Sequence, residues 1–249
     1  MKTLAIRPDP GVAVPNTAMV MAAGLGTRMR PLSVTRPKPL IQIKGTTFID
    51  HVLDHVRAAG VMRIVVNVHY MADMLEAHLA AQARDLDVRI SDERTKLLDT
   101  GGGLFQALPL IDADPFFCVN TDNIWIDGPM DSLKMMARMW NQADMDVLML
   151  LVPLARANQH AGQGDFYLDP YGRLTRRRPN RVAPYVWAGI QLLSKSLVVD
   201  PPSDVFSTNV FWDRAITSGR AYGLVHQGLW FDVGTPGAIP RAEAMMADG

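Results

Sequence analysis

The sequence predicts an α/β protein in which a Rossmann-like, mixed and mostly parallel sheet lies between two layers of helices, giving three layers in all. Three features of the 249 residues support this fold class: short apolar runs recur, helix-like segments separate most of them, and the second half is rich in short strands and turns. Apolar runs without a polar face are typical of parallel strands buried on both sides. Their alternation with helices therefore indicates a sheet covered on both faces.

Five apolar runs are expected to form strands of this sheet, at residues 18–23, 64–68, 88–91, 116–120 and 147–152. Helices are expected between them, at residues 48–59, 71–84 and 132–141. In the first helix, apolar residues recur at helical spacing and Gly60 follows as a C-cap. The second helix repeats the pattern, so we expect it to turn four residues toward the core: Met74, Leu75, Leu79 and Ala83.

The pattern changes after residue 152. Short strands are expected at residues 166–168, 174–176 and 185–193, then a helix at 210–218 and a closing helix at 236–249. No linker separates these parts, so residues 17–249 are predicted to form one domain, with a first part to about residue 152 and a β-rich part over about 153–235. Residues 1–16 lack periodicity, and we expect an extended arm there, the one hint of a homo-oligomer.

The composition excludes several classes of partner. The 25 basic and 25 acidic residues balance, so no global field attracts nucleic acid or an anionic membrane, and any anion site must be local. No segment has the length and apolarity of a signal peptide or a membrane span, which predicts a cytoplasmic protein. The single cysteine, Cys118, lies in an apolar strand, and we expect a buried, inert thiol.

A glycine-containing turn directly follows the first predicted strand, at residues 22–32. Gly24 and Gly26 permit a sharp turn that brings bare backbone N–H groups close to phosphate oxygens. Three cations nearby can neutralise phosphate charge: Arg28, Arg30 and Lys38. The stretch is neither a dinucleotide fingerprint, which needs a third glycine where Met29 stands, nor a P-loop. It nevertheless indicates nucleoside triphosphate chemistry.

Two aspartates follow predicted strands. Asp122 comes just after the strand at 116–120, where ligands bind in open α/β sheets, and Asp232 lies in a strand and turn that lead into the closing helix. Transfer of a nucleotidyl group needs positive charge around phosphorus, and Mg²⁺ commonly takes one or two carboxylates together with phosphate oxygens and water. Each aspartate alone is equally compatible with a cap or turn.

These motifs together resemble the sugar-1-phosphate nucleotidyltransferases. Residues 24–32 match the family signature Gly-x-Gly-(Thr/Ser)-Arg-(Met/Leu)-x-Pro-Leu, residues 37–40 match its Pro-Lys-Pro-Leu, and residues 230–236 match its Trp-x-Asp-(Val/Ile)-Gly-Thr-Pro block. The resemblance implies the nucleotide-diphospho-sugar transferase fold, with a nucleotide-binding first part and a sugar-binding β-rich part. It implies Arg28 and Lys38 as catalytic residues, Asp122 and Asp232 as ligands of Mg²⁺, and a phosphate-binding loop formed by Ala23, Gly24, Leu25, Gly26 and Thr27.

Two further elements correspond to the family's ligand contacts. The glycine-rich segment at residues 97–104 would contact the nucleobase and ribose through Asp99, Thr100, Gly101 and Gly102, its three glycines leaving room for a flat ligand; the alternative is a flexible turn and N-cap. Trp187 and Gly189 lie in a strand resembling the one beside the sugar, and Asn209 either binds the sugar or caps a helix. For the basic run at 176–178, a solvated hairpin is favoured over an anion site.

Within the family, the chain most resembles the compact branch that includes the N-acetylmuramate 1-phosphate uridylyltransferases of peptidoglycan recycling. Residues 97–103 show that branch's Leu-Leu-(Asp/Glu)-Thr-Gly-Gly-Gly, and no hexapeptide repeat follows. The expected substrates are thus UTP and N-acetylmuramate 1-phosphate. Alternatives are a mannose- or heptose-1-phosphate guanylyltransferase, a glycosyltransferase, whose Asp-x-Asp element is broken by Ile124, and a non-catalytic regulator that binds nucleotide sugars.

Overall fold

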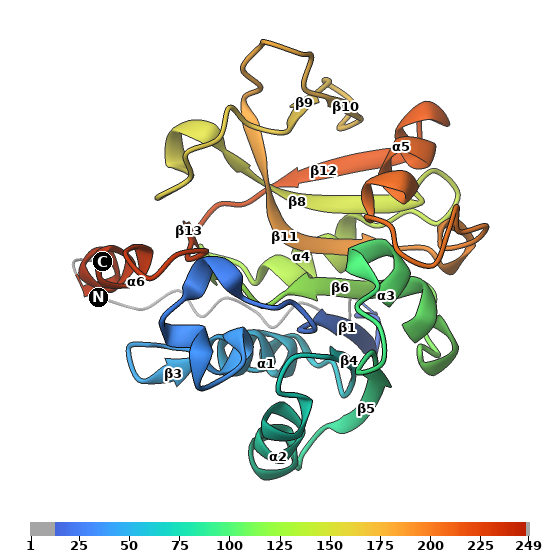
Figure 1. The fold of residues 1–249 in the computed structure, drawn as a ribbon. Coiled ribbons are helices and arrows are strands. Elements are labelled where there is room, and N and C mark those ends of the chain that lie inside the picture. The colour runs from blue at the N-terminus through green and yellow to red at the C-terminus, as the bar shows by residue number, and fades with distance from the viewer. Residues whose placement is uncertain (1–12, 248–249) are drawn as a thin grey trace, which may run out of the picture.

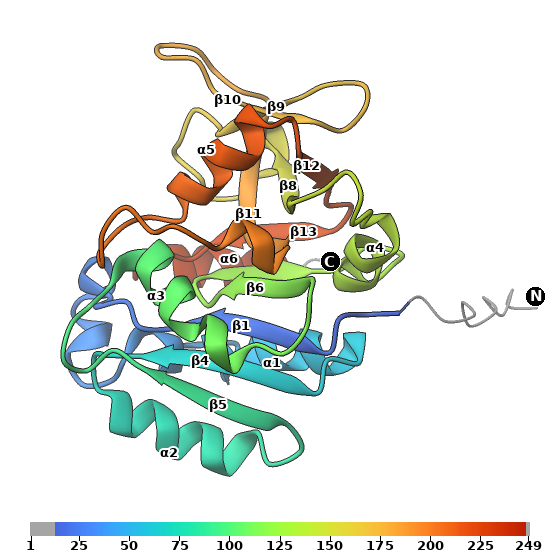
Figure 2. The same ribbon diagram turned by 90° about the vertical axis from the view of Figure 1, so that its right-hand side faces the viewer.

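The computed structural model describes residues 13–247, and its centre is one mixed sheet (Figures 1 and 2). Four neighbouring strands run parallel: β5 (Asp87–Asp92), β4 (Arg63–Val68), β1 (Thr17–Met21) and β6 (Phe116–Asn120). The chain passes from β1 to β4 on one side and reaches β6 on the other side of β1. The strand order therefore reverses at β1, and such switch points open a crevice at the carboxyl ends of the strands.

The long strand β11 (Tyr185–Leu193) connects this parallel half to the rest of the sheet. It pairs antiparallel with β6, with β8 (Val147–Pro153) and with β9 (Phe166–Leu168). Two further strands complete the sheet, as β12 (Ala221–Val225) pairs parallel with β8 and β10 (Leu174–Arg176) pairs antiparallel with β9. The predicted α/β class with a mixed, largely parallel sheet is confirmed.

Alternate side chains of the strands enter two apolar cores, one on each face of the sheet. Val20 belongs to the first core and Met19 to the second. The first core is covered by α1 (Phe48–Ala59), α2 (Ala72–Gln82) and α4 (Ser132–Met139), and the second by α3 (Asp99–Ala107) and α5 (Asn209–Thr217). Cys118 lies in the second core, where burial raises the pKa of its thiol to about 12, as expected for an inert cysteine.

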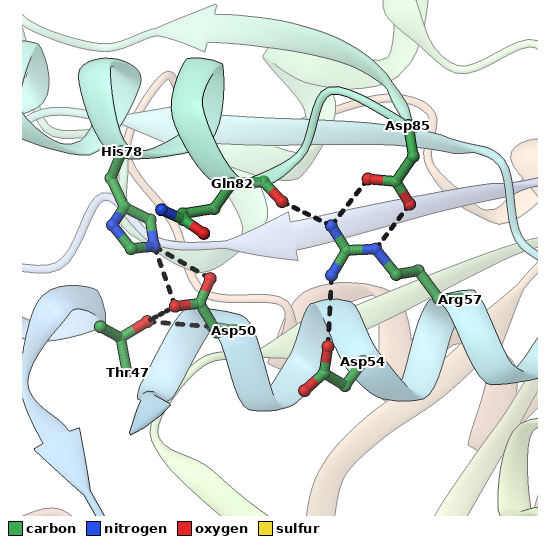
Figure 3. Close-up of polar contacts among 7 residues, drawn as sticks. All are labelled: Thr47, Asp50, Asp54, Arg57, His78, Gln82 and Asp85. Carbon is green, nitrogen blue, oxygen red and sulfur yellow. Dashed lines mark hydrogen bonds and ion pairs between the residues drawn. The ribbon is translucent and has the colours of Figure 1, made fainter. Parts of the chain in front are cut away.

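Helix α1 begins and ends where the sequence predicts. The Thr47 hydroxyl accepts from the Asp50 N–H at 3.2 Å, and Gly60 ends the helix with a φ of 91°. Polar side chains then connect α1 to α2 (Figure 3). The Asp50 carboxylate lies 2.9 Å from His78 Nε2, and Arg57 Nη2 donates to the Gln82 carbonyl at 2.7 Å. These contacts fix α2 against α1 at the edge of the first core.

A separate two-stranded sheet carries both predicted metal ligands to one place. In it, β7 (Asn123–Ile126) pairs antiparallel with β13 (Leu229–Asp232), and Asp232 lies opposite Asn123. Their apolar side chains join a third core with α6 (Ala238–Ala247), which includes buried Ile124, Phe231 and Ile239. The same core reaches the short hairpin of β2 (Gln42–Ile43) and β3 (Thr46–Thr47) through Ile43.

The structure also departs from some local predictions. The sequence analysis did not predict β7 or β12, and Met74 is 45% exposed although it was expected to face the core. Most of the predicted arm, residues 1–12, lies outside the described residues, but Asn16 next to β1 accepts a 3.0 Å hydrogen bond from the Met62 N–H. Within residues 13–247, no helix combines the length and apolarity needed to span a membrane.

Candidate functional site

A cavity of about 310 Å³ opens at the carboxyl ends of the parallel strands, on the side of the sheet's switch point. Each wall follows a different strand. Residues 22–24 follow β1, Asn67 lies near the end of β4, Glu93 follows β5, and residues 120–122 extend from β6. The topology therefore collects loops that are far apart in the sequence around one space, which is large enough for a nucleotide's base and ribose.

The first wall is the predicted phosphate loop. Gly26 has a φ of 63°, and a Cβ there would lie 2.9 Å from Lys38 Cβ, so only glycine permits this close approach. The Ser33 hydroxyl donates to the Gly26 carbonyl at 2.7 Å and holds the turn. Among the described residues, the backbone N–H groups of residues 24–27 have no hydrogen-bond acceptor. The loop thus offers a row of unused donors, which suits a phosphate.

The predicted catalytic cations lie on either side of this loop. Lys38 lines the cavity, and its Nζ lies 2.7 Å from Asp122 Oδ2. Arg28 is exposed and does not line the cavity, but its Nη1 lies 3.3 Å from where a Cβ of Gly234 would stand. Gly234 is two residues beyond Asp232, and the same Cβ position is 3.0 Å from that carboxylate. The first motif and the C-terminal block therefore meet in space.

The β7–β13 ladder brings Asp122 and Asp232 to the same edge, because Asp122 directly precedes the partner of Asp232. Both side chains are partly exposed, at 28% and 33%. Two hard carboxylate ligands with open sides fit Mg²⁺, which completes its octahedron with phosphate oxygens and water. No cluster of three or more His, Cys, Asp or Glu side chains that could hold a metal occurs within residues 13–247. A cation here would thus depend on the substrate for its remaining ligands.

His160 is a neighbour of this site that the sequence analysis missed. Its Nδ1 lies 3.5 Å from Asp232 Oδ2, and its ring packs edge-on against Trp230. The Asn158 side chain in the same loop donates to the Trp230 carbonyl at 3.0 Å. The contact joins segments 72 residues apart in the chain, and no local pattern around His160 signals it.

The glycine-rich segment at 101–103 packs against the segment that precedes α5. The N–H groups of Gly101 and Gly102 donate to the Phe206 carbonyl, at 2.8 and 3.1 Å. A Cβ on Gly101 would lie 2.6 Å from the Phe206 ring, and one on Gly102 would lie 2.2 Å from the Asp204 carbonyl. These glycines are buried and make room for the segment before α5, and neither lines the cavity. Both glycines therefore pack against the segment before α5, and their contact with a nucleotide stays a prediction.

A buried hydrogen-bonded pair lies beside Gly103. Asn67 Nδ2 donates to Glu93 Oε1 at 2.7 Å, and Asn67 Oδ1 accepts from the Ala22 N–H at 2.7 Å. The second oxygen of Glu93 accepts from the Leu98 N–H at 3.1 Å. Burial raises the pKa of Glu93, although these hydrogen bonds oppose the shift. The pair of Asn67 and Glu93 therefore connects the loop that begins at Ala22 to the loop that contains Leu98.

Asp99 and Thr100 behave as predicted in position, since both line the cavity. Asp99 is held at a φ of 60°, and its Oδ1 accepts from the Thr100 N–H at 2.6 Å. Such a left-handed conformation is uncommon outside glycine and tends to occur at functional sites. Thr100 Oγ1 also accepts from the Thr208 N–H at 3.0 Å, which connects the loop to the start of α5.

A second cavity of about 370 Å³ adjoins the first, and Asp99 and Thr100 line both. Its other walls come from the β-rich part and α5: Asp165, Phe166, Arg176, Trp187, Ser207, Thr208, Asn209 and Trp212. Trp187 and Asn209 were predicted to bind sugar, and the cavity includes both. Asn209 is the first residue of α5, after the N-cap Thr208, so the alternative capping role is not observed.

Gly189 and Arg176 differ in their position relative to this cavity. Gly189 does not line either cavity; it sits at a bulge of β11 with a φ of 84°, where a Cβ would lie 2.2 Å from Asn123 Nδ2. Its missing side chain makes room for Asn123. Arg176 lies in the predicted hairpin, at the end of β10, and it also lines the second cavity, where its Nε donates to Asp213 at 2.8 Å.

Sequence comparisons show that the chain is similar to nucleotidyltransferases. Residues 17–161 match the sequence model of the family described as nucleotidyl transferase. The chain is 41% identical over 237 residues to N-acetylmuramate alpha-1-phosphate uridylyltransferase of Caulobacter vibrioides, covering 94% of this chain and 98% of that protein. It is 29% identical to the catalytic subunit beta of mannose-1-phosphate guanylyltransferase of Danio rerio, over 88% of this chain and 61% of that protein.

Solved structures resemble the fold at lower identity. HddC from Yersinia pseudotuberculosis, complexed with GMP-PN, superposes with a TM-score of 0.75 at 24% identity, over 93% of this chain and 99% of that one. UDP-glucose pyrophosphorylase from Acinetobacter baumanii gives a TM-score of 0.76 at 16% identity, over 92% of each chain. These likenesses support the fold that the sequence predicted.

Proposed function

The chain belongs to the nucleotidyl transferase family, and from this premise we propose that it transfers a uridylyl group from UTP to N-acetylmuramate 1-phosphate. The products are the nucleotide sugar and pyrophosphate. The observation that carries the proposal is the adjacency of the two cavities, which share Asp99 and Thr100. A nucleotide in the first and a sugar phosphate in the second would meet at that wall, as transfer between them requires.

The choice of substrates rests on similarity. The Caulobacter vibrioides protein, named for UTP-dependent transfer to N-acetylmuramate 1-phosphate, is 41% identical, whereas the Danio rerio guanylyltransferase is 29% identical and longer than the matched region. A guanylyltransferase is therefore the second candidate. With UTP and a sugar phosphate as substrates, we place the enzyme in the cytoplasm and assign it to recycling of peptidoglycan sugars.

In the proposed mechanism, an oxygen of the sugar 1-phosphate attacks the α-phosphorus of UTP in line with the leaving pyrophosphate. The attacking phosphate is already ionised near neutral pH, so the enzyme needs no general base. Its task is to align the two phosphates and to offset their charge. No covalent enzyme intermediate is required.

Named residues supply these effects. The free N–H groups of residues 24–27 would bind the triphosphate, and Arg28 would stabilise charge on the leaving pyrophosphate. Lys38, which now neutralises Asp122, would shift toward the α-phosphate and the attacking phosphate. Mg²⁺ held by Asp122 and Asp232 would supply further positive charge at the phosphates.

The decisive experiment is pyrophosphate release in Mg²⁺ across five nucleoside triphosphates (UTP, GTP, dTTP, CTP and ATP). Each is crossed with the 1-phosphates of N-acetylmuramate, N-acetylglucosamine, glucose, mannose and heptose. We expect release with UTP and N-acetylmuramate 1-phosphate to exceed every other combination. Preference for GTP with mannose or heptose 1-phosphate would retain the enzyme class and overturn both substrate assignments.

A further inference from the structure

We propose that Arg176 recognises a carboxylate on the sugar and thereby determines which sugar 1-phosphate the enzyme accepts. The inference rests on the proposed function, because it takes the second cavity as the place where the sugar binds. Arg176 ends β10, and it is the one cationic side chain among the residues that line this cavity within the described part of the chain. A charged substituent on the sugar would find its opposite charge there.

The Arg176 guanidinium is fixed before any ligand arrives. It lies over two aromatic rings, 5.1 Å from the centre of Phe166 and 5.3 Å from that of Trp212. Nε donates to Asp213 at 2.8 Å, and Nη2 donates to the Asn209 carbonyl at 3.3 Å. Stacking and two hydrogen bonds thus hold the side chain in one orientation, so binding a ligand costs little further side-chain entropy.

One edge of the guanidinium remains available. Nη1 has no hydrogen-bond acceptor within residues 13–247, and Nη2 has a second N–H group. Nε and Nη2 form the side edge that protein atoms occupy, so the end edge formed by Nη1 and Nη2 is left for a ligand. Two parallel N–H groups match the two oxygens of a carboxylate, which is the geometry of the strongest arginine contacts.

The acidic residues around Arg176 leave only one place in the cavity where a ligand carboxylate can bind favourably. Asp213 pairs with Arg176, Asp165 Oδ2 accepts from the Trp187 N–H at 2.9 Å, and Asp99 accepts from Thr100. The remaining oxygens of Asp99 and Asp165, which both line the cavity, suit sugar hydroxyl and amide N–H groups but repel the carboxylate of a ligand. A carboxylated sugar is therefore stable only with its charge against Arg176. Without the guanidinium, the same cavity would disfavour that ligand.

Two sugar 1-phosphates that differ only in the lactyl group can test the contact between Arg176 and the carboxylate. N-acetylmuramate is N-acetylglucosamine with a lactyl ether on O3, and the lactyl carboxylate is ionised near neutral pH. The two 1-phosphates share the hexose, the acetamide and the reacting phosphate. A residue that binds the lactyl carboxylate must therefore affect one substrate far more than the other.

The neighbouring arginines provide matched controls, because neither lines a cavity. Arg177 donates to the Gln163 side chain and to the Arg181 carbonyl. Arg178 is exposed to solvent. Arg178→Met therefore makes the same chemical change two residues away without touching the proposed contact.

The test compares the wild type with Arg176→Met, Arg176→Lys and Arg178→Met, using UTP with either sugar phosphate. Where N-acetylglucosamine 1-phosphate turns over slowly, its competitive inhibition constant replaces kcat/KM. Loss of a charged hydrogen-bonded contact predicts that Arg176→Met lowers kcat/KM for N-acetylmuramate 1-phosphate by about 10- to 100-fold, mainly through KM. The value for the sugar without the carboxylate falls by less than about threefold, Arg176→Lys recovers part of the loss, and Arg178→Met changes neither.

Equal losses with both sugars would show that Arg176 only supports the fold of the cavity, and no loss with either would show that it makes no contact; both results overturn the inference. Thermal unfolding of each variant checks folding directly. If the wild type uses UTP with other sugars but not with N-acetylmuramate 1-phosphate, the proposed substrate fails and the inference fails with it. If the wild type prefers N-acetylmuramate 1-phosphate and Arg176→Met retains that preference, only the role of Arg176 is wrong.

Discussion

The Lys38 ammonium donates a 2.7 Å hydrogen bond to Asp122 Oδ2, so a predicted catalytic cation and a predicted metal ligand neutralise each other. Both groups line the cavity at the ends of β1 and β6. A substrate phosphate competes for Lys38 while a divalent cation competes for Asp122. The ion pair therefore belongs to the ligand-free enzyme. Binding of the phosphate to Lys38 and of the cation to Asp122 would break it.

Asp122→Asn removes one of the two carboxylates while preserving the size of the side chain. We expect turnover dependent on Mg²⁺ to fall by at least about 100-fold, because an amide oxygen binds a hard cation far more weakly than a carboxylate. The assay is pyrophosphate release over a range of Mg²⁺ concentrations. Asp54→Asn on α1, whose side chain is 68% exposed, is the matched control and should behave as the wild type. Retained dependence on Mg²⁺ in Asp122→Asn would remove this residue from the metal site.

Arg28→Ala should separate activity from stability. Arg28 is exposed, so the free energy of unfolding should change by no more than about 0.5 kcal/mol. The turnover number should fall about 100-fold, because a charge-assisted contact made in the transition state is worth a few kcal/mol. Urea unfolding and steady-state kinetics on the same preparation measure both quantities, and Arg241→Ala on the surface of α6 serves as control. An unchanged turnover number would exclude Arg28 from catalysis.

Glu93→Gln tests the buried pair with Asn67. Both Glu93 oxygens accept hydrogen bonds, from Asn67 Nδ2 and from the Leu98 N–H, and glutamine would turn a donor toward one of those donors. We expect a loss of about 1–3 kcal/mol in the free energy of unfolding. Glu243→Gln is the control, since Glu243 also accepts from a backbone N–H, that of Lys44, but at the surface. Equal unfolding free energies for Glu93→Gln and the wild type would contradict the pairing.

The same substitution predicts a change in pH dependence. Burial raises the pKa of Glu93 above its ordinary value of 4.5, so the native state keeps a proton that the unfolded chain has already lost. The contribution of Glu93 to stability is therefore complete below that value and declines as the pH rises through the raised native pKa. Unfolding free energies measured from acidic to neutral pH should show this decline in the wild type and a smaller one in Glu93→Gln. Parallel curves would show that Glu93 is not responsible.

Gly103→Ala should destabilise the site from within α3. A Cβ there would lie 2.5 Å from Glu93 Oε1 and 2.9 Å from Asn67 Nδ2, both held in the buried pair. Overpacking costs about 1–3 kcal/mol, and alanine in a helix returns about 1 kcal/mol, so the net effect should be a loss of up to about 2 kcal/mol. Thermal unfolding measures it. Gly237→Ala, with nothing within 4 Å of the added carbon, is the control, and a more stable Gly103→Ala would refute the clash.

The main sheet and α1 could be predicted from the sequence because local patterns determine them. Apolar runs marked β1, β4, β6 and β8, and helical spacing together with Gly60 marked α1. The strands β7 and β12 escaped prediction because each pairs with a partner far along the chain, so its register depends on packing. Met74 was placed inward on helical spacing alone, yet α2 turns that position toward solvent.

The candidate site was predictable where a residue follows a strand directly. Asp122 and the loop at 22–28 are examples, since the topology of a parallel sheet places such residues at one edge. The packing of the glycines at 101 and 102 could not be predicted, because their neighbours, Asp204 and Phe206, come from a distant segment that no local pattern reveals. The positions of Arg176 and His160 could not be predicted for the same reason, because their contacts, with Trp212 and Asp232, come from distant parts of the chain.

The β7–β13 ladder also bears on the order in which the enzyme is built. Its second strand, β13, follows every strand of the main sheet in the sequence, and it carries Asp232. Every strand of the main sheet has left the ribosome before Asp232 does, so the nascent protein can assemble its nucleotide loops while the second predicted metal ligand is still missing. Catalytic competence would therefore arise only after the strands of the main sheet have been synthesised, when β13 pairs with β7.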